Sequence, residues 1–168
     1  EIFLMSTQKP FALNWLWLSA AIIAADFLSK LWALSKLQYM QSVEVVPGFW
    51  NWTLVHNTGA AFSFLADAGG WQKWFFSLLA LAISAVCVVI LKKTERHAWR
   101  TALPLALIVG GAMGNLIDRV RFGYVIDFVH WYWNSFHWPV FNLADSAISI
   151  AAVLLIAFSF FPDGKPDK

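Results

Sequence analysis

Four aspartates lie within or beside long apolar stretches of the chain, where a charged group is costly and usually has a function. They are Asp26, Asp118, Asp127 and Asp145. The first two have a basic neighbour, Lys30 or Arg119, whereas Asp127 and Asp145 have no Lys or Arg within four residues. These last two are therefore the candidates for a reactive carboxyl pair.

Two carboxyl groups that lie close together cannot easily both ionise, so they share a proton and titrate as a pair. One carboxylate can then act as a base on a water molecule, while its protonated partner donates to the carbonyl oxygen of an amide. The spacing alone does not bring Asp127 and Asp145 together. Acids inside membranes also serve as ion relays or structural partners, and these alternatives stay open at this point.

The other two aspartates are predicted to be structural. Asp26 and Lys30 are four residues apart, so on a helix they share a face and can neutralise each other. Asp118 stands directly before Arg119, which favours a buried ion pair that fixes a helix end. Both pairs are expected to position a site and not to react.

The elements that carry these acids are predicted to be membrane helices. The chain has 168 residues, of which 60% are hydrophobic and 13% charged, with a mean hydropathy of +0.60, far from a typical soluble domain. The predicted helices cover about residues 13–34, 71–91, 99–117 and 140–161. Segments 36–70 and 118–139 would lie outside the membrane. We predict a membrane all-α fold, a single four-helix bundle over residues 1–168.

The two outer segments differ in pattern. Turn residues Pro47-Gly48 and Asn57-Thr58-Gly59 separate short runs that are typical of strands, at 43–46, 49–55 and 60–65. These runs predict a small β-rich segment. The stretch 124–138 is rich in aromatic residues, which settle at the level of lipid headgroups, and is predicted to be an interfacial loop that moves as a flap.

The distribution of basic residues predicts the orientation. Short cytoplasmic loops collect Lys and Arg, and four of them crowd the connection between the second and third helices. They are Lys92, Lys93, Arg96 and Arg100. Both termini are therefore expected in the cytoplasm, which puts all four aspartates toward the outer side. The first stretch is too long for a cleaved signal, so it is interpreted as a retained helix. Residues 1–4 are expected to be foreign to a protein that starts at Met5.

Other chemistries have little support in the sequence. It contains neither a G-x-S-x-G elbow nor an H-E-x-x-H pair, and its four histidines lack the spacing of a metal-ligand set. The single cysteine, Cys87, excludes a disulfide framework or a cysteine metal site. We expect no metal, no cofactor and no nucleic-acid partner.

Five motifs in order give the chain a resemblance that spacing alone could not supply. They are Asp26-Phe27-Leu28-Ser29-Lys30, Asn57-Thr58-Gly59-Ala60-Ala61-Phe62, Gly114-Asn115-Leu116-Ile117-Asp118-Arg119, Val125-Ile126-Asp127-Phe128 and Phe141-Asn142-Leu143-Ala144-Asp145. Over residues 10–162 the chain resembles the lipoprotein signal peptidases, or signal peptidase II family, which are bacterial membrane aspartyl proteases. Each motif is weak alone, but five in order on four helices are specific.

The resemblance implies a function and a set of site residues. Asp127 and Asp145 would be the catalytic pair, and the substrate would be a prolipoprotein, cut just before a cysteine that carries a diacylglyceryl group. The positions that would support the site or hold substrate are Asp26, Lys30, Asn57, Gly59, Asn115, Asp118, Arg119 and Asn142. The protein would work in the bacterial inner membrane, in contact with lipid, with its site toward the periplasm.

Two interpretations from other classes remain. A proton-conducting protein would use Asp26, Lys30 and Asp145 as a relay, but the cytoplasmic halves of the predicted helices offer it no polar steps. A membrane scaffold needs only a face of small residues at Gly110, Gly111 and Gly114, along which helices pack closely. The scaffold leaves Asp127 and Asp145 without a role.

Overall fold

The computed structural model describes residues 11–59 and 69–160. In chain order the elements are η1 (Ala12–Trp15), α1 (Leu16–Lys36), β1 (Ser42–Val46), β2 (Trp50–Asn57), α2 (Gln72–Lys93), α3 (Trp99–Phe122), β3 (Val125–Trp133), β4 (Phe136–His137) and α4 (Leu143–Phe160). Within the described ranges, four helical spans are long and apolar enough to cross a membrane, as predicted. The predicted strand at 60–65 lies outside the described residues.

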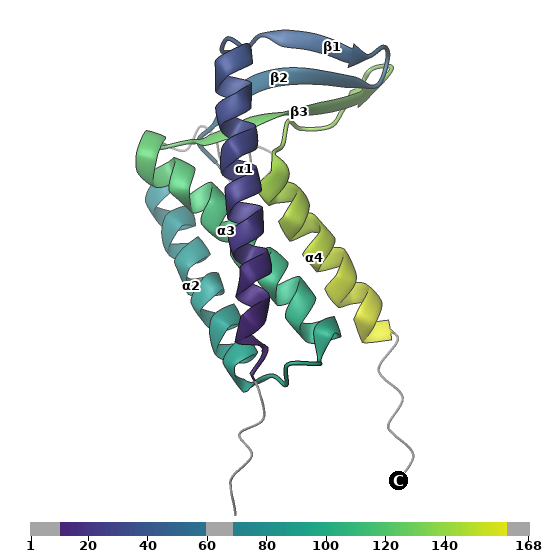
Figure 1. The fold of residues 1–168 in the computed structure, drawn as a ribbon. Helices are drawn as coiled ribbons and strands as arrows, with labels where there is room; N and C mark the ends of the chain where they lie inside the picture. Colours follow the sequence, from purple (N-terminus) through teal and green to yellow (C-terminus); the bar gives the residue numbers. More distant parts are fainter. Residues whose placement is uncertain (1–10, 60–68, 161–168) are drawn as a thin grey trace, which may run out of the picture.

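Helix α3 is the centre of the bundle. It packs against α1, α2 and α4, and it is the most buried of the four helices (Figure 1). Glycines make the close approach possible: a Cβ at Gly110 would lie 2.9 Å from Cβ of Ile22 on α1, and one at Gly111 would lie 2.5 Å from the carbonyl oxygen of Ala144 on α4. The small residues on this face of α3 therefore allow α1 and α4 to pack closely against it.

The third and fourth helices differ from the predicted ranges. The prediction ended the third helix at residue 117, before its charged residues, but α3 continues to Phe122. Gly123 caps the end of the helix: it has a φ of +83° and donates its N–H to the carbonyl oxygen of Arg119. Helix α4 begins at Leu143 and not at residue 140, because Asn142 caps it. Polar side chains with partners in the fold explain both differences.

An antiparallel sheet stands at one end of the bundle, with strand order β1-β2-β3-β4 (Figure 1). The start of α1 and the end of α4 lie at the opposite end of the bundle. The aromatic segment 124–138, predicted to be a loop, is instead mostly strand: β3 pairs with β2, with Val55 opposite Asp127, and β4 pairs back onto β3. The prediction missed this strand because its pairing partner is distant in sequence.

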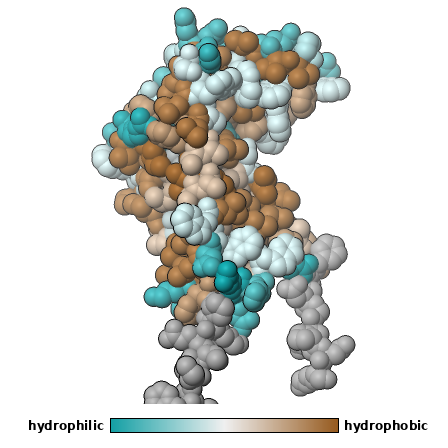
Figure 2. Space-filling model, in the orientation of Figure 1, coloured by the Kyte–Doolittle hydropathy of each residue, from teal (hydrophilic) through white to brown (hydrophobic). Residues whose placement is uncertain are grey.

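The end of the bundle away from the sheet has an apolar core, which we call the apolar cluster. It consists of Ala12, Cys87, Leu91, Ala102, Leu105 and Val109. On the surface, hydrophobic residues cover the middle of the bundle and hydrophilic residues gather at its two ends (Figure 2). This distribution fits a protein whose middle contacts hydrocarbon.

Candidate active site

Asp127 and Asp145, which we call the aspartate pair, meet where the sheet joins the bundle. Asp127 lies on β3 and is 0% exposed, and Asp145 lies in the first turn of α4 and is 4% exposed. One side chain links them: Asn142 donates its amide N–H to Oδ1 of Asp127 at 2.7 Å, and its Oδ1 accepts from the backbone N–H of Asp145 at 2.8 Å. The fold therefore brings together the two acids that the sequence singled out.

Local structure explains the position of Asn142. The residue before it, Phe141, exchanges backbone hydrogen bonds with Val129 of β3 (3.0 and 2.8 Å), which holds the start of α4 against the strand. Asn142 is then the N-cap of α4, and Asp145 reaches back to the Asn142 N–H at 3.4 Å. This reciprocal arrangement is a capping box. It satisfies helix-end N–H groups and aims the Asn142 amide group at Asp127.

Two further amides orient the aspartate pair. Asn57, at the end of β2, donates to Oδ2 of Asp127 at 2.9 Å. Asn115 of α3 donates to Oδ1 of Asp145 at 2.7 Å, and its own Oδ1 accepts from Asn142 at 3.0 Å. Both oxygens of Asp127 are thus held by amide donors from different elements. All three asparagines are buried, so each bond stands in place of a bond to water.

A second group of charges lies next to the aspartate pair and consists of Lys30, Asp26 and Asp118, which we call the lysine cluster. Lys30 of α1 contacts Asp26 at 2.7 Å and Asp118 at 2.8 Å, and it donates to Oδ1 of Asn115 at 3.1 Å. The predicted Asp26–Lys30 pair is confirmed. The predicted Asp118–Arg119 pair is wrong, because adjacent residues on α3 point to different sides and Asp118 faces Lys30 of α1.

The two acids of the lysine cluster hold the backbone next to the reactive residues. Asp26 accepts from the N–H of Ala144 at 2.9 Å, the residue before Asp145. Asp118 accepts from the N–H of Ile126 at 3.1 Å, the residue before Asp127. One lysine therefore joins two carboxylates that each fix one member of the aspartate pair. Sequence reasoning did not find these backbone contacts, since no local signal encodes them.

The glycine face of α3 makes room for this cluster. A Cβ at Gly114 would lie 2.8 Å from Oδ2 of Asp26 and 3.3 Å from Cβ of Ala144. Any side chain at this position would push away the carboxylate that fixes the residue before Asp145. The small-residue motif therefore has a use within the site in addition to helix packing.

Arg119 reaches the site from the other side of α3. Its Nη2 donates to the carbonyl oxygen of Gly59 at 2.8 Å, and the N–H of Gly59 donates to Oδ1 of Asn57 at 2.9 Å. This chain of contacts leads from Arg119 to Asp127 through Asn57. The guanidinium also lies over the ring of Phe76, 5.4 Å from its centroid, a residue that the sequence did not single out.

Burial controls the charge of the pair. It raises the pKa of Asp127 well above the ordinary carboxyl value, and the nearby charge of Asp145 raises it further. Hydrogen bonds from Asn57 and Asn142 and the charge of Lys30 act in the opposite direction. Asp127 therefore holds a proton to higher pH than a solvated carboxyl does. This is the electrostatic condition for one carboxyl to donate while the other accepts.

A cavity of about 290 Å³ opens beside Asp145. Its lining residues are Trp131, Trp138, Phe141, Asp145, Ser146, Ser149 and Ile150. The site is thus open on a mostly apolar side. Among the described residues, no group of three or more His, Cys, Asp or Glu side chains is placed to hold a metal ion.

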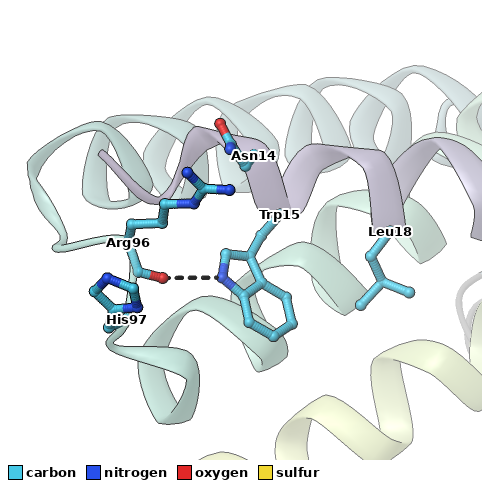
Figure 3. Close-up of a pocket in the computed structure, with 5 residues that line it drawn as sticks. All are labelled: Asn14, Trp15, Leu18, Arg96 and His97. Atoms are coloured by element: carbon cyan, nitrogen blue, oxygen red, sulfur yellow. Dashed lines mark hydrogen bonds between the residues drawn. The ribbon is translucent and has the colours of Figure 1, made fainter. Parts of the chain in front are cut away.

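A larger cavity of about 650 Å³ lies at the opposite end of the bundle, between the start of α1 and the α2–α3 connection (Figure 3). Trp15, Arg96 and His97 line it with Asn14 and Leu18, and Nε1 of Trp15 donates to the carbonyl oxygen of Arg96 at 3.4 Å. None of these five residues carries a carboxyl group. The cavity beside Asp145, though smaller, is therefore the better candidate for substrate binding.

Comparison with known proteins adds an independent finding. The profile of the family described as "Signal peptidase (SPase) II" matches residues 18–161. A lipoprotein signal peptidase of Xanthomonas oryzae pv. oryzae is 55% identical over 153 residues, which cover 91% of this chain and 92% of that protein. A lipoprotein signal peptidase of Xylella fastidiosa is 55% identical over 159 residues, covering 95% of both.

Solved structures agree with the sequence matches. A structure described as a bacterial membrane enzyme, solved at 2.3 Å, superposes with a TM-score of 0.80 at 29% identity, covering 95% of this chain and 96% of that one. Another with the same description, solved at 1.9 Å, has a TM-score of 0.75 at 28% identity, covering 93% of this chain and 97% of that one. The likeness therefore extends over the bundle and the sheet.

Proposed function

Since this chain belongs to the signal peptidase II family, we propose that Asp127 and Asp145 are the two catalytic carboxyls with which it cuts prolipoproteins. The family and its relatives make the chain a protease that removes prolipoprotein signal peptides. One observation carries the assignment of residues: Asn142 contacts Asp127 with its amide N–H and Asp145 with its amide oxygen. This contact supports a site with two buried carboxyls around one point.

The mechanism follows from the unequal protonation of the pair. In this proposal Asp127 is the carboxyl that carries the shared proton, since it is fully buried and burial and the charge of Asp145 raise its pKa. The Asp145 carboxylate takes a proton from a water molecule, whose oxygen attacks the scissile carbonyl carbon, while Asp127 donates its proton to the carbonyl oxygen. The tetrahedral intermediate then breaks its C–N bond, and the amine leaves with a proton from Asp145. Asp127 recovers its proton as the carbonyl of the new carboxyl group forms, so the pair is ready for another turnover.

The surrounding polar groups keep this geometry fixed. Asn57 and Asn142 hold the two oxygens of Asp127, and Asn115 holds Asp145, so neither carboxyl can rotate away from the water. Arg119 lies at the margin of the site, and its Nε is buried with no acceptor among the described residues. A substrate carbonyl oxygen would satisfy that donor. Electrostatic preorganisation of this kind is often the largest contribution to catalysis.

The cavity beside Asp145 supports the identity of the substrate. The cavity is lined in part by Trp131, Trp138 and Phe141. These aromatic residues suit an apolar group attached next to the scissile bond. A diacylglyceryl-modified cysteine at the cleavage point provides such a group. Its acyl chains would remain in the membrane while the peptide bond reaches Asp145.

The distribution of charge supports an orientation in the bacterial inner membrane. The last turn of α2, with Lys92 and Lys93, and the α2–α3 connection, with Arg96, lie at the end of the bundle away from the sheet. By the positive-inside rule this end and both termini are cytoplasmic. The aspartate pair then faces the periplasm, and the aromatic β3–β4 hairpin lies along the periplasmic surface of the inner membrane.

Cleavage of a diacylglyceryl-modified prolipoprotein by the purified protein in detergent tests the assignment. Asp127→Asn and Asp145→Asn should each abolish cleavage while the protein stays folded, and Glu44→Gln, which removes an exposed carboxyl on β1, should leave it unchanged. The unmodified prolipoprotein should remain uncut. Cleavage that persists in either aspartate variant would move the chemistry to Asp26 or Asp118.

A further inference from the structure

A third pocket lies between α2 and α3, at the end of the bundle that carries the sheet. Its volume is about 650 Å³, within the range of small-molecule sites. The residues that line this α2–α3 pocket are Lys73, Trp74, Ser77, Leu78, Leu81, Leu116, Arg119, Val120, Arg121, Phe122 and Gly123. None of them is acidic, and apart from Arg119 none belongs to the aspartate pair or its supporting residues.

The pocket is divided into a cationic end and an apolar length. Lys73 lies in the first turn of α2, and Arg121 lies in the last turn of α3. Leu78 and Leu81 are five and eight residues beyond Lys73 on α2, which is about 7 to 12 Å along the helix. The cations therefore stand at one end, and the apolar walls extend from them toward the middle of the bundle.

Aromatic rings hold Lys73 and Arg121 in place, and neither has an acidic partner among the residues that the structure describes. Nζ of Lys73 lies 5.1 Å from the centroid of the Trp74 ring, and the guanidinium of Arg121 lies 5.1 Å from Phe27 and 4.8 Å from Phe122. Neither side chain forms an ion pair within the described parts of the chain. Their positive charge is thus available to an anion, and the N-terminal end of α2 adds to it.

The apolar part of the pocket is exposed to the surroundings of the protein. Trp74 and Leu78 are each 67% exposed, and Val120 is 76% exposed. A patch of this kind is stable where acyl chains cover it. An anion alone would use the cationic end and leave this surface uncovered. The chemistry that matches both parts is a negatively charged headgroup joined to an acyl chain.

We propose that the α2–α3 pocket binds an anionic phospholipid. Its phosphate lies between Lys73 and Arg121, and one acyl chain follows Leu78 and Leu81 along α2. The site explains why two cations stand at the end of the bundle opposite the basic α2–α3 connection, against the usual distribution of charge in a membrane protein. The bound lipid also lies next to Arg119, which connects the pocket to the aspartate pair.

Native mass spectrometry of the purified protein with phosphatidylglycerol or phosphatidylcholine, matched in acyl chains, tests the proposal. Phosphatidylglycerol should bind about tenfold more tightly or more, because two cations contribute at the membrane surface. Lys73→Gln combined with Arg121→Gln should remove this preference and leave phosphatidylcholine binding unchanged. Lys36→Gln is the matched control, since Lys36 is an exposed cation in the last turn of α1. Arg119 stays unaltered in all variants.

A second variant tests the apolar part with the cations intact. Ser77→Phe places a ring in the pocket, so it should weaken phosphatidylglycerol binding as strongly as the double substitution does. Equal affinity for the two lipids, or retained preference in the double variant, would overturn the proposal. Inorganic phosphate that displaces the lipid at equal concentration would assign the site to a free anion. Diacylglycerol that competes as well as phosphatidylglycerol would make it an acyl-chain site only.

Discussion

The two halves of α3 make different kinds of contact: the first half makes apolar contacts, and the second half makes polar and charged ones. Its first half packs Ala102, Leu105 and Val109 into the apolar cluster with residues of η1 and α2. Its second half packs glycines against α1 and α4 and then presents Asn115 and Asp118 to buried charges and amides. Contacts in the first half require only shape, whereas each polar group in the second half requires a specific partner.

The difference follows from the membrane as a solvent. Helices in hydrocarbon gain little from burying apolar surface, so apolar residues there associate mainly by close packing. A polar group in the same surroundings has no water to bond with and is costly unless the fold supplies a partner. We therefore expect substitutions in the apolar half to change stability alone, and substitutions in the polar half to change stability and turnover together.

The largest effect is expected from Lys30→Met. The substitution leaves the Asp26 and Asp118 carboxylates buried without their shared cation, and breaking such a pair costs about 3–5 kcal/mol. Unfolding in mixed detergent micelles, followed by tryptophan fluorescence, measures this loss. Lys36→Met on the same helix removes an exposed cation and should have almost no effect. Similar losses in the two variants would mean that the lysine cluster is not a distinct unit.

In the apolar cluster, against which the first half of α3 packs, Leu91→Ala of α2 should cost less stability and leave the chemistry unchanged. Leu91 is 0% exposed, and its truncation leaves a cavity, which costs about 2 kcal/mol, near the low end for such changes because lipid also solvates the unfolded helices. Turnover per folded molecule should equal that of the parent protein. A large fall in turnover with the fold intact would remove the functional distinction between the two halves.

Asn142, which donates to Asn115 of the polar half, separates the effects on stability and on turnover. Asn142→Ala removes both the N-cap and the contact to Asp127, so we expect a stability loss of about 1 kcal/mol and a fall in turnover of about 10- to 100-fold. Asn142→Ser keeps an oxygen that can cap α4 but cannot reach Asp127 with an amide group. Its stability should recover while its turnover stays low. Recovery of both would show that capping alone is what the site needs from Asn142.

The same contrast explains what the sequence could predict. Composition and apolar windows predicted the four spans, because these depend on residues close together in the chain. The capping box at Asn142 and Asp145 could also be found from its local spacing. The partner of Asp118 could not, since Lys30 is on another helix and Arg119 stands next to it as the obvious but wrong choice.

The sheet shows the same limit. Residues 124–138 have aromatic side chains that suit both a membrane interface and a strand, so their composition does not distinguish a loop from β3. The register that sets Val55 opposite Asp127 is a long-range property. It also determines that Asp127 points at Asn57 and Asn142. The candidate residues were therefore found by type and motif, while their mutual geometry required the fold.

The most specific effect concerns pH. Because the pKa of Asp127 is raised in the folded protein, the folded state binds more protons than the unfolded state between the ordinary carboxyl pKa and the raised one. Stability contributed by this group is therefore lost as the pH rises through that window, by about 1.4 kcal/mol per pH unit. Asp127→Asn cannot lose a proton, so its stability relative to the parent should increase with pH.

Thermal unfolding of both proteins from about pH 4 to pH 9 measures this difference in slope. The parent should lose stability relative to Asp127→Asn on going to alkaline pH, even if the variant starts lower because one amide donor then faces its Nδ2 group. The control is Leu91→Ala, whose difference from the parent should not depend on pH, since the apolar cluster contains no carboxyl group. A constant difference for Asp127→Asn as well would mean that Asp127 is ionised in the folded protein, and the proton donor in cleavage would have to be Asp145.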